Sequence, residues 1–239
     1  MGVSRVAYPS IQELKAMGLE GLDRANRDIE REGVRSLEVR WIFSGRLAVP
    51  MAGWFGRFPA QAIALADAYL VDPYLPGLSV KVRERRALEV KVYHGSPGLI
   101  EVPGRARGRL ESWEKWSFPC GPASQVGGDQ AGWRTVGKRR RVCWFSRAGG
   151  GAVARFPRPG EKPGCAVELA EFRVLGEDWW TLGFEAPGQG DAVRGELDAA
   201  AALVFAQALP GGAELGMDES MSYARWLRGQ PGIGNNPEA

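Results

Sequence analysis

The sequence contains few of the side chains that nucleophilic catalysis and structural metal binding most often use. Its 239 residues include one histidine and three cysteines. His94 stands beside Gly95 at the end of a predicted strand, which argues against Ser-His-Asp or Cys-His catalysis. The odd number of cysteines, Cys120, Cys143 and Cys165, and the lack of a C-x-x-C spacing argue against a zinc site and a disulfide framework.

Long apolar runs are also absent. No stretch reaches the roughly 18 apolar residues that a membrane-spanning helix requires, and residues 1–14 lack the apolar core of a signal peptide. We therefore expect a soluble, cytoplasmic protein without a membrane partner. A net charge of +3 does not demand a nucleic-acid partner, so we expect none.

Charged and apolar residues alternate along residues 77–94 (GLSVKVRERRALEVKVYH). With a period of two, Val80 and Val82 take one face of a first strand, and Val90 and Val92 take the same face of a second. The opposite, polar face of the two strands carries Ser79, Lys81, Arg83, Arg85, Glu89, Lys91 and Tyr93. An ordinary hairpin would turn such a face toward water.

The same alternation recurs along the chain, which favours a different arrangement. It is found in Ser36–Phe43, Leu110–Phe118, Trp133–Phe145 and a predicted hairpin formed by 165–175 and 179–186. A sheet with many charges on one face can close into a barrel with a polar interior. We predict an α+β protein: an antiparallel, eight-stranded closed β-barrel with a polar, basic lumen and helices packed outside.

Helical segments are expected at both ends of the barrel sequence. Ser10 and Glu13 have the spacing of a capping box and predict a helical segment within residues 1–35. The barrel domain is predicted over residues 36–228, with an apolar helix at Asp198–Leu209 and a short helix at Met217–Leu227. Residues 229–239 are expected to form a disordered tail.

These strands, in this order, resemble the triphosphate tunnel metalloenzymes, or CYTH superfamily, which includes inorganic triphosphatases, thiamine triphosphatase and class IV adenylyl cyclases. The first strand of that family carries E-x-E-x-K, whereas this chain has Ser36-Leu37-Glu38-Val39-Arg40. The segments VKVRER and LEVKV resemble its basic third and fourth strands, and Ser222-Tyr223 its C-terminal helix. The late acidic strands resemble VELAE and LGFEA, with Ala170 where a second acid often stands.

The chemistry of this residue set suits phosphate groups. Lysine and arginine make short, strong hydrogen bonds to anionic oxygens, and arginine can make two in parallel. The predicted phosphate-binding set comprises Arg40, Lys81, Arg83, Arg85, Lys91, Lys115, Lys138 and Arg140.

The resemblance further implies a divalent metal and a reaction. Glu38, Glu168 and Glu185 would hold Mg²⁺ or Mn²⁺, which prefer oxygen ligands, and Glu38 and Lys91 would take a direct part in catalysis. The alternative is that the acids only pair with the basic residues and keep an empty barrel neutral.

Aromatic residues leave the substrate open. Most of the nine tryptophans fit a role in the core, but alternation turns Trp113 and Trp144 inward, where they would line a pocket for an organic group. We expect the protein to bind an organic di- or triphosphate and to cleave its phosphate linkage. The alternatives are a lyase or cyclase that releases diphosphate, for example from a prenyl diphosphate, and a non-catalytic binding module. The only partner predicted is this small molecule, and the oligomeric state is left open.

Overall fold

The computed structural model describes residues 33–120, 132–148, 151–156 and 164–230. Most of the predicted N-terminal helical segment and of the predicted tail lies outside these residues. In chain order, the elements are β1 (Val34–Ser44), α3 (Val49–Phe55), β2 (Gln61–Leu70), β3 (Leu78–Arg83), β4 (Ala87–Val102), β5 (Ala106–Pro119), β6 (Trp133–Ala148), β7 (Gly151–Ala154), β8 (Cys165–Val174), β9 (Glu177–Pro187), α4 (Asp191–Val204), the 3-10 helix η1 (Pro210–Gly212) and α5 (Tyr223–Arg228).

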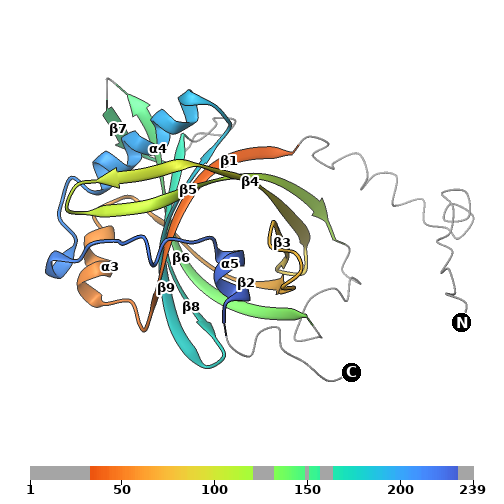
Figure 1. Ribbon diagram of the computed structural model, residues 1–239. Helices are drawn as coiled ribbons and strands as arrows, with labels where there is room; N and C mark the ends of the chain where they lie inside the picture. The colour runs from red at the N-terminus through yellow and green to blue at the C-terminus, as the bar shows by residue number, and fades with distance from the viewer. Residues whose placement is uncertain (1–32, 121–131, 149–150, 157–163, 231–239) are drawn as a thin grey trace, which may run out of the picture.

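Eight antiparallel strands close into a barrel (Figure 1). Their order is β2-β3-β4-β5-β1-β9-β8-β6, and pairing of β6 with β2 completes the ring. This confirms the predicted fold class. The short strand β7 is not part of the ring and pairs only with the end of β6. It lies between the predicted strand Trp133–Phe145 and the predicted hairpin that begins at residue 165, where the alternation predicted no strand.

Strand β4 is longer than the sequence predicted. Gly95, Pro97 and Gly98 indicated its end, yet it continues to Val102 and stays paired with β5. The register shifts between Tyr93 and Gly98, which marks a β-bulge. Gly95 and Gly98 have φ angles of 115° and 130°, which glycine adopts without a steric penalty, so the strand bends there and continues.

The main apolar core lies outside the ring of strands, under helix α4. Outward residues of the strands, including Trp41, Leu169 and Phe184, pack against the buried face of α4 around Leu197. This helix begins and ends earlier than the predicted 198–209. The apolar run continues past its end because Leu209 is also buried, so hydrophobicity did not mark where the helix stops.

Helix α5 is an exception to the prediction that the helices pack outside. Figure 1 shows it within the ring of strands. Its buried Trp226 and Leu227 pack against inward apolar side chains, including Ile42, Val136 and Phe172, from three different strands. This apolar cluster and α5 fill one end of the barrel. Among the described residues, no helix has the length and apolar character needed to cross a bilayer.

Candidate functional site

A cavity of about 180 Å³ occupies the interior of the barrel next to α5. The residues that line it come mainly from alternate positions of the strands, as the period-two pattern predicted. Seven of them are basic: Arg40, Lys81, Arg83, Lys91, Lys115, Lys138 and Arg140. Six are acidic: Glu38, Asp67, Glu89, Glu111, Glu168 and Glu185. The lumen is therefore strongly charged, and its formal charges nearly balance.

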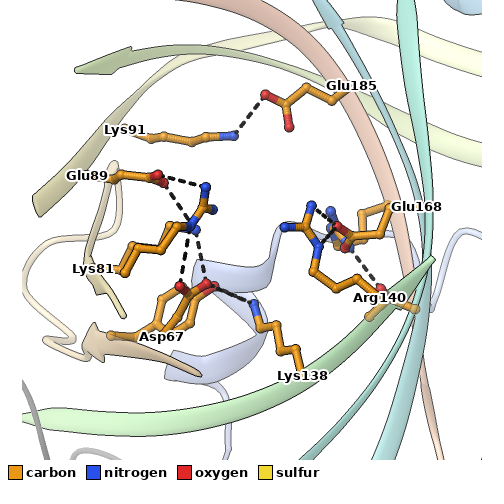
Figure 2. A network of polar contacts seen from close by, with 12 residues as sticks. Asp67, Lys81, Glu89, Lys91, Lys138, Arg140, Glu168 and Glu185 are labelled. Carbon is orange, nitrogen blue, oxygen red and sulfur yellow. Dashed lines mark hydrogen bonds and ion pairs between the residues drawn. The ribbon is translucent and has the colours of Figure 1, made fainter. Parts of the chain in front are cut away.

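One group of ion pairs, the Asp67 cluster, comprises Asp67, Lys81, Arg83, Glu89 and Lys138 (Figure 2). The Lys81 Nζ lies 3.1 Å from Asp67 Oδ2 and 3.2 Å from Glu89 Oε2. The Arg83 Nη1 lies 2.9 Å from Glu89 Oε1, and its Nε lies 3.5 Å from Asp67 Oδ1. The Lys138 Nζ lies 3.7 Å from Asp67 Oδ2. The Asp67 side chain is only 2% exposed, so these contacts exclude most of the water around it.

This environment shifts the protonation equilibria of the Asp67 cluster. Burial raises the pKa of Asp67. The ammonium of Lys81 and the other nearby cations lower it by a larger amount, so the pKa of Asp67 lies below its usual value. Burial likewise raises the pKa of Glu89, but the charges of Lys81 and Arg83 lower it by a larger amount, so the net shift is downward. Burial lowers the pKa of Lys138 well below its usual value, and the charge of Lys81 adds to this effect.

A second group, the Glu168 cluster, joins Glu168 with Arg40 and Arg140 on the other side of the lumen (Figure 2). The Arg40 Nη1 donates to Glu168 Oε1 at 2.9 Å and to Thr181 Oγ1 at 2.8 Å. Arg140 donates to Glu168 Oε2 through Nε and Nη2. Burial raises the pKa of Glu168, but the two guanidiniums lower it more strongly, so the net shift is downward.

A third group, the Lys91 triad, consists of Lys91, Glu38 and Glu185. The Lys91 Nζ donates to Glu38 Oε1 at 2.6 Å and lies 3.7 Å from Glu185 Oε1. Lys91 belongs to β4, whereas the two glutamates belong to β1 and β9, which lie beyond β5 in the ring. Its side chain therefore reaches past β5 to Glu38, and past β5 and β1 toward Glu185.

Several donors of the lumen have spare hydrogen-bonding capacity. The buried Arg83 Nε and Tyr223 Oη have no hydrogen-bond partner among the described residues. Lys115 lines the cavity and makes no ion pair with a carboxylate in the part of the chain described. A buried donor without a partner loses its hydrogen bonds to water. Of these groups, Lys115 is only half-buried, so an anion in the cavity could pair with its ammonium.

The predicted site residues were brought together in the lumen, with two exceptions. Arg85 lies in the turn between β3 and β4, with a φ of 57°, and its exposed side chain does not line the cavity. Trp144 is also outside the lining, and its ring lies 6.2 Å from that of Phe156. Trp113 does line the cavity, where its Nε1 donates to Glu111 Oε2 at 3.0 Å.

The three acids predicted to hold Mg²⁺ or Mn²⁺ do not converge on one point. Within the described residues, no group of three or more His, Cys, Asp or Glu side chains is arranged to hold a metal ion. Glu168 accepts from two guanidiniums, while Glu38 and Glu185 share the Lys91 ammonium. A divalent cation would meet positive charge at each carboxylate, so the acids in this arrangement do not fit one.

Sequence reasoning missed three lumen residues: Asp67, Tyr69 and Glu111. Asp67 and Tyr69 stand two apart on β2, and the Tyr69 hydroxyl donates to Asp67 Oδ2 at 3.2 Å. In the sequence, Asp67 could have been recognised as a candidate because it is the single acidic residue in the otherwise apolar segment ALADAYL. Alternation did place Glu111 on the same face as Lys115 but gave it no role. Burial raises the pKa of Glu111, and no cation pairs with it in the described structure.

Comparisons with known proteins add structural similarities. Protein-family models and curated proteins give no match. Solved structures with a similar fold include the PH1819 protein from Pyrococcus horikoshii OT3, with 13% identity over 80% of this chain and 97% of that chain, and a TM-score of 0.39. The Pct1 RNA triphosphatase of S. pombe, solved in complex with the Spt5 CTD, matches 83% of this chain and 87% of its own, with 10% identity and a TM-score of 0.38.

HpAC1 from Hippeastrum, a protein with a dominant triphosphatase activity, matches 72% of this chain and 87% of its own, with 11% identity and a TM-score of 0.34. The closed barrel itself agrees with the resemblance to the triphosphate tunnel metalloenzymes that the sequence predicted.

Proposed function

We propose that the protein binds an organic di- or triphosphate in the lumen of its barrel and cleaves a phosphate linkage there. The observation that carries this proposal is the convergence of seven lysine and arginine side chains on one cavity inside the barrel. Charged donors in a site with little water hold anionic oxygens strongly. A ligand with several negative charges could pair with several of these charged donors at once.

An unpaired lysine of the lumen supports the binding step. Lys115 lines the cavity and makes no ion pair with a carboxylate in the described structure. A phosphoryl oxygen would pair with its ammonium and leave the existing ion pairs in place. A ligand with two or three phosphoryl groups would reach donors on opposite walls of the barrel.

The same arrangement suits cleavage of the bound phosphate. Phosphoryl transfer is catalysed mainly by positioning and by stabilisation of charge on the phosphoryl oxygens. Cations held in place by ion pairs need little reorganisation when that charge develops. Lys91 stays charged because Glu185 and Glu38 raise its pKa, although burial lowers it.

A non-catalytic binding module is the second candidate. It is favoured by the pairing of Glu38, Glu168 and Glu185 with basic side chains, which leaves none of these acids free to act on a substrate. The lyase alternative has less support, because Trp144 lies outside the cavity lining and the indole nitrogen of Trp113 is engaged with Glu111.

A substrate panel separates these functions. Inorganic triphosphate, nucleoside triphosphates, thiamine triphosphate and prenyl diphosphates would be tested for binding by calorimetry, for phosphate release and for organic products. Each would be run with Mg²⁺, with Mn²⁺ and with a chelator, because divalent cations bind polyphosphates in solution. Phosphate release supports the proposal, and binding without a product supports the binding module. Diphosphate released with a rearranged organic product indicates a lyase.

Adjacent arginines of β6 provide a matched pair of variants. Arg140 points into the lumen, whereas the side chain of Arg139 is 79% exposed on the outside. Arg140→Gln should weaken triphosphate binding by about 10- to 100-fold, since a hydrogen bond to a charged group contributes about 1.5–3 kcal/mol. Arg139→Gln should bind like the wild type. Equal affinity of the two variants, or no binding of any phosphate on the panel, would overturn the proposed function.

A further inference from the structure

Three glutamates stand side by side on the lumen face of adjacent strands. In the strand register, Glu38 of β1 lies opposite Glu111 of β5 on one side and opposite Glu185 of β9 on the other. Carboxylates directly opposite one another on one face of a sheet repel. Glu111 accepts a hydrogen bond from Trp113 Nε1 at 3.0 Å, and its pKa is raised, chiefly by burial and also by the charge of Glu38. Glu38 and Glu185 still require a cation.

The Lys91 ammonium occupies the place where that cation is needed. It contacts Glu38 at 2.6 Å and lies 3.7 Å from Glu185, and its side chain is 19% exposed. The Ser36 hydroxyl donates to the same Glu38 oxygen at 2.6 Å, which fixes that carboxylate toward Lys91. Glu168, the third acid predicted to bind metal, is held apart by Arg40 and Arg140.

We propose that Lys91 is the built-in cation of this site: its ammonium neutralises Glu38 and Glu185 in place of a divalent metal. A metal ion at these carboxylates would have to displace a half-buried ammonium and leave it without a partner, which is unfavourable. The unliganded barrel therefore has no high-affinity site for Mg²⁺ or Mn²⁺ at Glu38 and Glu185. This inference concerns the empty lumen and does not depend on the proposed function.

Removal of the ammonium should expose the latent metal site. In Lys91→Met, an apolar side chain of similar length replaces the lysine and leaves two neighbouring carboxylates unpaired. We expect this variant to bind one Mn²⁺ about tenfold or more tighter than the wild type, since a positive charge at contact distance from the ion is removed. The double variant Glu38→Gln, Lys91→Met should lose the gain.

The neighbouring lysine of β5 is the matched control. Lys115 is the register partner of Lys91 and also lines the cavity, but it makes no ion pair with Glu38 or Glu185 in the described structure. Lys115→Met removes the same charge and adds the same side chain. This variant should not gain Mn²⁺ binding. The comparison therefore distinguishes the effect of the position of Lys91 from the effect of removing one positive charge from the lumen.

The experiment is a titration of the full-length protein, without substrate, with Mn²⁺ followed by electron paramagnetic resonance, and circular dichroism confirms that each variant is folded. Stoichiometric Mn²⁺ binding by the wild type that Glu38→Gln abolishes would overturn the inference. A folded Lys91→Met variant without a gain would overturn it as well. If Lys91→Met fails to fold, the wild-type titration decides, and absence of binding at the two glutamates supports the inference. Triphosphate binding measured in chelator tests the proposed function separately, since neither result determines the other.

Discussion

Replacement of Asp67 by asparagine tests the charge network of the lumen most directly. Asparagine keeps the size of the side chain but removes the charge that Lys81, Arg83 and Lys138 contact at 3.1 to 3.7 Å. Glu89 alone then faces two of these three cations, and Lys138 keeps no carboxylate within ion-pair distance in the described structure. Breaking a buried ion pair by removing one partner costs about 3–5 kcal/mol.

The expected loss is large enough for a simple thermal measurement. For a domain of this size, each kcal/mol changes the melting temperature by about 2–4 °C, so Asp67→Asn should melt about 6–20 °C below the wild type. Inorganic triphosphate should raise the melting temperature of the variant more than that of the wild type, because the anion replaces the lost charge. Asp178→Asn is the control, since Asp178 pairs at 2.8 Å with the largely exposed Arg46 and should change little.

An Asp67→Asn variant that melts like the wild type would refute the view that these buried charges depend on one another. A normal triphosphate response together with a large loss of stability would show that the network holds the fold but does not receive the ligand. The two readouts therefore test packing and binding separately.

Two further predictions concern acid stability and packing. Because the guanidiniums that contact Glu168 depress its pKa despite burial, its contribution to stability is present above the usual value of 4.5 and is lost as the pH falls below it. Urea unfolding at pH 7 and pH 3 measures this loss, and an equal loss in Glu168→Gln would contradict the assignment. Gly108→Ala would place a Cβ 2.5 Å from the buried ring of Trp41, so calorimetry should show a loss of about 1–3 kcal/mol. Gly137→Ala is the control, since nothing lies within 4 Å of its added Cβ, and equal effects of the two would contradict the packing argument.

The alternation of residues predicted the barrel and most of its lining because inward and outward positions follow directly from a strand period of two. It failed for Arg85, where β3 has already ended and Glu84 and Arg85 adopt positive φ angles. The letters RERRA contain no glycine, asparagine or proline to indicate that turn. The alternation of charged residues therefore continues past Arg83, where β3 ends.

Which acidic residue pairs with which basic residue could not be predicted from the sequence. Lys91 comes near Glu185 only because the curved sheet brings β4 toward β9, with β5 and β1 between them in the ring, and neither local pattern nor spacing specifies closure and register together. The position of α5 inside the ring of strands could not be predicted from the sequence either. An apolar stripe with Tyr223 and Trp226 suits a helix on the outside of a sheet as well as one inside a barrel.

Helix α5 and its aromatic neighbours fill one end of the ring, so within the described residues the charged cavity is closed from that side. Under the proposed function, the product of cleavage would have to leave from the side by which the substrate enters. Its release would then limit turnover whenever the product keeps enough negative charge to be held by the lysines and arginines of the lumen.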